Sequence, residues 1–126
     1  MQDRFKFRYF SSNNNMEEIS FTNCYYTNLD YSKLMQCTGL KDKNGKLIYE
    51  GDIVQTTFEN NSKIIFSVVW DNKTALFNGK IIKKEGINNY FMPNLDYLYY
   101  LLGNEKDEVE VIGNINENPE LIRGEQ

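Results

Sequence analysis

The sequence predicts a mainly β protein, a β-rich α+β chain forming a small antiparallel barrel or sandwich of short strands with one short helix and a C-terminal helical turn. Three observations predict this class. Short stretches rich in β-branched and aromatic residues recur, Asn- and Gly-rich turns separate them, and helix signals are confined to the last third of the chain. The 126 residues, 40% of them hydrophobic, fit a single domain over residues 1–126 that needs no metal or disulfide staple.

The first half of the chain predicts several strands and one strong turn. Phe5–Phe10 alternates aromatic with basic residues through Arg8, which predicts a half-buried strand with one cationic face. Asn44-Gly45 predicts a type I′ hairpin turn, because that turn needs positive φ at both central positions. Further strands are expected at Glu18–Phe21, Lys33–Cys37 and Ile53–Phe58.

The second half contains the clearest strand, Lys63–Trp70, whose two faces are both largely apolar. We therefore expect it to be central and covered on both sides, with Trp70 as a core anchor that leads into a turn. A second hairpin is expected with Asn78-Gly79 at its tip, and Val109–Ile115 reads as a last strand.

Helix signals occur in two places. Asn94 is a good N-cap and Gly103 a good C′ residue for a helix of about two turns. Asn118 and Pro119 are the cap and first residue of a helical turn. The first helix is apolar on nearly every side, so we expect it to pack against another copy of the chain; burial between two sheet faces is the alternative. Its candidate interface residues are Tyr97, Leu98, Tyr99, Tyr100 and Leu102.

Composition excludes several kinds of chemistry. Without a single His, the chain has no Ser-His-Asp triad, Cys-His pair or His-ligated zinc. Cys24 and Cys37 are too few for a thiolate zinc site, and we expect both to be reduced and buried without an essential bridge. No phosphate-binding glycine motif and no apolar leader or span occurs, so we expect no cofactor, no membrane and a cytoplasmic location.

The charge pattern leaves two further functions open. A net charge of −4 gives no basic footprint, and two small basic clusters read as solvated faces: Arg4, Lys6 and Arg8, and then Lys41, Lys43 and Lys46. Alternatively, these clusters and neighbouring aromatic residues contact a single-stranded nucleic acid. A third interpretation is a carboxylate-dependent enzyme, because Glu50 and Asp52 would share one face of an extended strand.

Three segments stand in a distinctive order: Arg4–Arg8, the long run Leu34–Val54, and Val109–Leu121, with Val68–Asp71 between the last two. Together they resemble the YopX-like family of phage and prophage proteins. The resemblance implies a mainly β fold, a phage context and plausible oligomerisation, and it supplies no catalytic residues.

From these observations we expect a non-enzymatic phage or prophage accessory protein. It would be a self-associating β-rich module that binds a host or phage macromolecule, with inhibition of a host defence as one form of that role. The host-cell cytoplasm is its expected compartment. Nucleic-acid binding remains the alternative.

Overall fold

The fold is described here from a computed structural model, which places residues 6–11, 14–19, 34–58, 61–73, 75–86 and 108–123. Over these ranges the chain forms two four-stranded antiparallel sheets and one short helix. The mainly β class is therefore confirmed. The described strands form two separate sheets and do not close into one barrel.

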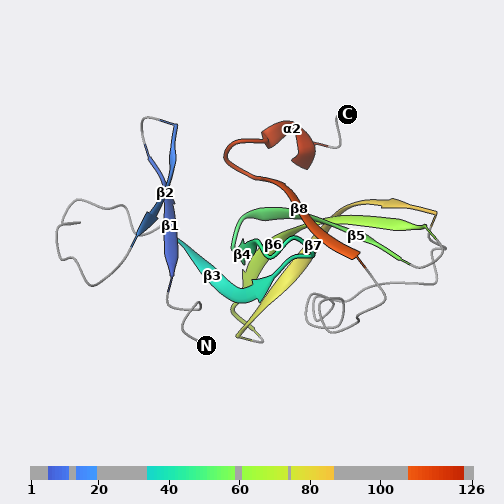
Figure 1. Ribbon diagram of the computed structural model, residues 1–126, viewed down its shortest axis with the longest axis horizontal. Coiled ribbons are helices and arrows are strands. Elements are labelled where there is room, and N and C mark those ends of the chain that lie inside the picture. The colour runs from blue at the N-terminus through green and yellow to red at the C-terminus, as the bar shows by residue number, and fades with distance from the viewer. Residues whose placement is uncertain are drawn as a thin grey trace.

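The first sheet has the strand order β2-β1-β3-β4. In Figure 1, β1 and β2 stand to one side of the molecule, and β3 runs from them into the main body. The first residues of β3 pair with β1 and its later residues pair with β4, so one strand belongs to both parts. The strands are β1 (Phe7–Phe10), β2 (Met16–Ile19), β3 (Leu34–Lys41) and β4 (Leu47–Tyr49).

The second sheet has the order β7-β6-β5-β8. Its strands are β5 (Asp52–Thr57), β6 (Lys63–Asp71), β7 (Leu76–Glu85) and β8 (Glu108–Asn114). β6 lies between β5 and β7 and is buried from Ile64 to Val68, so the predicted central strand is confirmed. The core cluster consists of Ile48, Val54, Ile64, Phe66, Val68 and Val109.

The hairpin predicted at Asn78-Gly79 is wrong, because both residues lie inside the uninterrupted strand β7. The reason is packing: a Cβ at Gly79 would lie 2.6 Å from Cδ2 of the core residue Phe66. Asn78 is also buried, and its Nδ2 donates to Asp71 Oδ2 at 3.4 Å. Gly79 therefore makes room for a ring and does not reverse the chain.

A turn does occur at Asn44-Gly45, but its predicted type is wrong. Gly45 has a φ of +81°, whereas Asn44 is not among the residues with positive φ. Gly45 N donates to Asp42 O at 3.0 Å, and Asp42 N donates to Lys46 O at 2.8 Å. These bonds close a three-residue loop, a type I turn followed by a left-handed glycine.

The predicted C-terminal helical turn is present as α2 (Pro119–Ile122), with the proline in its first turn. Asn118 does not cap it with its side chain; Oδ1 of Asn118 accepts a hydrogen bond from Asn114 N at 3.1 Å. The expected helix at Asn94–Gly103 and its candidate interface lie outside the described residues. Within the described part of the chain, no helix has the length and apolar character needed to cross a membrane.

Candidate functional site

The two sheets are joined by a tight corner at Gly51, between β4 and β5. Gly51 has a φ of +87°, which favours glycine. Its N–H donates to Val68 O at 2.8 Å, and its carbonyl accepts from Ile115 N at 2.9 Å. A Cβ at this position would lie 2.9 Å from Met35 Sδ. The corner thus brings β3, β6 and the end of β8 together around one residue.

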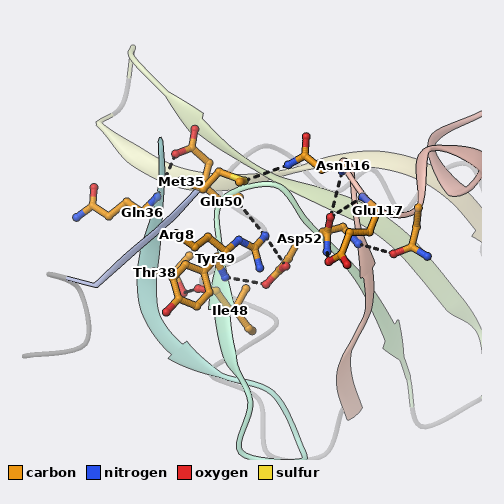
Figure 2. A network of polar contacts seen from close by, with 12 residues as sticks. Arg8, Met35, Gln36, Thr38, Ile48, Tyr49, Glu50, Asp52, Asn116 and Glu117 are labelled. Carbon is orange, nitrogen blue, oxygen red and sulfur yellow. Dashed lines mark hydrogen bonds and ion pairs between the residues drawn. The ribbon is translucent and has the colours of Figure 1, made fainter. Parts of the chain in front are cut away.

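An ion pair buried beside this corner links the two sheets (Figure 2). Arg8 Nη2 of β1 lies 2.7 Å from Asp52 Oδ1 of β5, and it also donates to Glu50 O at 3.2 Å. The Arg8 guanidinium carbon lies 4.8 Å from the centre of the Tyr49 ring. Asp52 Oδ2 accepts a further hydrogen bond from Tyr49 N at 2.8 Å. Four residues from three strands and the corner therefore fix the position of β1.

The pKa shifts of Asp52 and Tyr49 are those expected of buried groups held by fixed partners. Burial raises the pKa of the Asp52 carboxyl, and the Arg8 guanidinium opposes that rise. Burial also raises the pKa of Tyr49, as does the hydrogen bond that its Oη donates to Glu18 Oε1 at 2.9 Å. Tyr49 therefore stays protonated and attaches β2 to the same network.

The predicted cationic face of the first strand is wrong, because Arg8 is the buried residue of β1. Lys6 is exposed, and Arg4 lies outside the described residues. In the second basic cluster, Lys41 and Lys46 are exposed, whereas Lys43 Nζ lies 3.3 Å from Glu108 Oε2 and 3.8 Å from Glu110 Oε2. Arg8 could not be assigned from the alternation alone, since its partner is 44 residues away in the chain.

Glu50 and Asp52 do not share a face, because the positive φ of Gly51 interrupts the extended backbone between them. Asp52 is buried against Arg8, while Glu50 is half-buried and its Oε1 accepts from Gln36 N at 3.4 Å. The two carboxylates therefore have different surroundings. In the described part of the chain, no cluster of three His, Cys, Asp or Glu residues could hold a metal ion.

The predicted buried thiol is found at Cys37, whose Sγ accepts a hydrogen bond from Gly39 N at 3.4 Å. Cys24 lies outside the described residues.

A pocket of about 600 Å³ opens beside the corner, between the two sheets. Its walls are mostly apolar, with a few amide and hydroxyl groups and a single charged side chain, Glu50. The lining residues are Phe10, Ser11, Asn14, Leu34, Met35, Glu50, Gly51, Val68, Val69, Trp70, Ile115 and Asn116.

Trp70 lines this pocket, and its prediction as a core anchor is wrong. It is 43% exposed and packs edge-on against Phe77, with ring centres 5.0 Å apart. The cause is strand length, because β5 pairs with β6 only as far as Ser67 and leaves Trp70 beyond its end. The sequence carries a weak signal for this, an aromatic residue directly before the turn at Asp71.

The hairpin at residues 42–46 docks on β8. Asp42 Oδ2 accepts from Val111 N at 3.0 Å, and Lys43 N donates to Val109 O at 2.8 Å. Asp42 Oδ1 accepts from Asn44 N and Lys46 N, each at 2.9 Å. Burial raises the pKa of Asp42, but these backbone donors outweigh burial and hold it below its usual value.

Comparison with known proteins identifies the family of the chain. No curated protein matches it. Among solved structures, it is similar to the crystal structure of protein EF1440 from Enterococcus faecalis, with 28% identity, a TM-score of 0.43, and coverage of 86% of this chain and 67% of that one. The sequence profile of the YopX protein family matches residues 3–123, so the chain belongs to the YopX protein family.

Proposed function

We propose that this chain is a non-enzymatic accessory module that binds a macromolecular partner through the pocket between its two sheets. The observation that carries the proposal is Trp70, a large aromatic side chain that is 43% exposed in the wall of an apolar pocket. Tryptophan is the residue most enriched at the energetic centres of protein interfaces. A protein partner is therefore the favoured class.

The surroundings of Trp70 support this proposal. Ile115, 38% exposed, lines the same pocket, as do the half-buried Val69 and Leu34. Exposed apolar groups gathered at one hollow are typical of interaction sites, whereas single exposed ones are ordinary. The volume of about 600 Å³ accommodates one or two partner side chains.

A rigid frame holds these groups in place. Gly51 lines the pocket and hydrogen-bonds to both β6 and the end of β8, and Arg8 is paired with Asp52 directly behind this corner. A preformed site loses less conformational freedom on binding than a flexible one. This arrangement supports a binding function for the pocket beside the Gly51 corner.

Nucleic-acid binding is the second candidate, and only one observation favours it. An exposed Trp70 can stack on an unpaired base. Against it, the one charged wall residue is the acidic Glu50, and Arg8 is buried in an ion pair. A phosphate backbone would approach a carboxylate, so this class is less well supported.

The wider role follows from the family resemblance. We propose that the protein acts in the host-cell cytoplasm as a phage or prophage product, self-associates, and inhibits a host or phage protein by occluding part of its surface. Blocking a host defence is one form of that role. Such action needs no catalytic group.

The proposal is tested by site-specific photo-cross-linking in cells that produce the protein. A benzophenone amino acid replaces Trp70 in one variant and Glu85 in the control, since Glu85 lies at the opposite end of the β6–β7 pair. We expect one protein partner to be cross-linked from position 70 and absent from position 85. Equal products from both positions, or cross-linked nucleic acid from position 70, would overturn the proposal.

A further inference from the structure

Glu50 contributes a carboxylate to the wall of the pocket. Its one hydrogen bond is accepted from Gln36 N at 3.4 Å, and no basic side chain among the described residues forms an ion pair with it. Asp52, two residues away, is neutralised by Arg8 at 2.7 Å. The corner thus presents two carboxylates, and among the described residues only Asp52 has a cation as its partner.

Two wall residues are followed in the sequence by acidic residues. Asp71 and Glu117 directly follow the wall residues Trp70 and Asn116. Neither the lining residues nor their described neighbours in the sequence include a Lys or an Arg. A partner that buries its surface here therefore meets the Glu50 carboxylate in the wall of a mostly apolar hollow, and a cation is its electrostatic complement.

We propose that the pocket takes a linear protein segment in which a large apolar side chain stands next to a Lys or Arg. This inference rests on the proposed function and specifies the partner's chemistry. The apolar side chain packs against Trp70 and Ile115, and the neighbouring cation pairs with Glu50. A cation beside the Trp70 indole gains further attraction from the ring.

The charge is tested by Glu50→Gln. The new amide oxygen still accepts from Gln36 N, so the corner keeps its hydrogen bond while the pocket loses its charge. Glu85→Gln is the matched control, since that carboxylate lies at the far end of β7 from the pocket. Trp70→Ala removes the aromatic wall at an exposed position and leaves the core intact.

The experiment selects random linear peptides, displayed on phage, on the immobilised full-length chain. Binding of the enriched peptides is then measured on all four proteins by calorimetry. We expect enrichment of a large apolar residue next to Lys or Arg. Glu50→Gln should weaken these peptides about tenfold, equivalent to about 1.4 kcal/mol, because the amide can still accept a hydrogen bond but no longer carries the charge. Trp70→Ala should abolish binding, and Glu85→Gln should leave it unchanged.

Each of the other possible results would overturn a specific part of the proposal. Enriched apolar peptides without a basic residue, or equal affinity for the wild type and Glu50→Gln, would overturn the cationic specificity while leaving the pocket as a binding site. Peptides that bind Trp70→Ala as well as the wild type would overturn the pocket itself. Failure to enrich any peptide would overturn the linear-segment inference, and the cross-linking at position 70 would still test the proposed function.

Discussion

Arg8 and Asp52 lie 2.7 Å apart with 8% and 1% of their side chains exposed, and they tie β1 of the first sheet to β5 of the second. Taking both charges out of water is costly, and their attraction offsets that cost only while both are present. We therefore expect the pair to contribute less to net stability than to the choice of one arrangement of the two sheets.

Replacing one member of the pair should be strongly destabilising. Asp52→Asn leaves the Arg8 guanidinium buried without a counter-charge, which costs about 3–5 kcal/mol in comparable cases. Urea unfolding followed by circular dichroism measures this loss. The double variant Arg8→Met/Asp52→Asn should recover much of it, because no charge is then buried. An Asp52→Asn protein as stable as the wild type would show that the pair is not closed in solution.

Asp42 makes a pH-dependent contribution that can be isolated. Because its pKa is lowered in the folded protein, its stabilising effect is present above the unfolded value of about 3.9 and is lost as pH falls through the folded value. Asp42→Asn cannot titrate, and its amide would face a donor, either Val111 N or the turn N–H groups of Asn44 and Lys46.

We expect the wild type to be more stable than Asp42→Asn by about 1–3 kcal/mol at neutral pH. The difference should shrink below about pH 4. Urea unfolding of both proteins from pH 2 to pH 7 measures it. A difference in stability that stays constant down to pH 2 would contradict a stabilising role for the ionised Asp42 carboxylate.

Substitutions at two glycines should destabilise the fold for different reasons, backbone strain at Gly45 and overpacking at Gly79. Gly45 has a φ of +81° and open space around it, whereas a Cβ at Gly79 would meet the Phe66 ring at 2.6 Å. Gly45→Ala should cost about 1 kcal/mol through backbone strain alone, and Gly45→Val should cost more. Gly79→Ala should cost about 1–3 kcal/mol through overpacking of the core. Thermal and urea unfolding compare them, and an unchanged Gly79→Ala protein would mean that the ring moves freely.

Elements with a complete local signal could be predicted from the sequence. β6 is apolar on both faces and is central, β8 carries a clear apolar pattern, and Pro119 begins the last helical turn. The turn at Gly45 was correctly located, although its type depends on Asp42, whose carboxylate bonds inside the loop and to β8.

The parts that could not be predicted depend on distant partners. From the sequence alone, Arg8 is expected at the surface, because its partner Asp52 is distant in the chain. Gly79 is expected in a turn, because its packing against Phe66 depends on the neighbouring strand. Trp70 is expected to be a core anchor because the sequence does not show that β5 begins only opposite Ser67 and leaves Trp70 unpaired on that edge of β6. The pocket combines residues from both sheets, so no single segment of sequence could reveal it.

Self-association remains a prediction from Tyr97–Leu102, a run of six large apolar or aromatic residues. Soluble monomers usually avoid exposing such a patch. Light scattering at micromolar concentration should give a mass above that of one 14.9 kDa chain. Tyr99→Lys with Leu102→Lys should then dissociate the oligomer without loss of strand content. A uniform 14.9 kDa species from the wild type would refute self-association.

The most direct test of the account is the affinity of the partner cross-linked at position 70 for three purified proteins: the wild type, Trp70→Ala and Glu85→Ala. The account predicts that Trp70→Ala weakens binding more than about tenfold, as loss of a central interface tryptophan does, and that Glu85→Ala binds like the wild type. Calorimetry gives all three dissociation constants, and circular dichroism confirms that the variants are folded. Equal affinity of the wild type and Trp70→Ala would show that the pocket between the sheets is not the binding site.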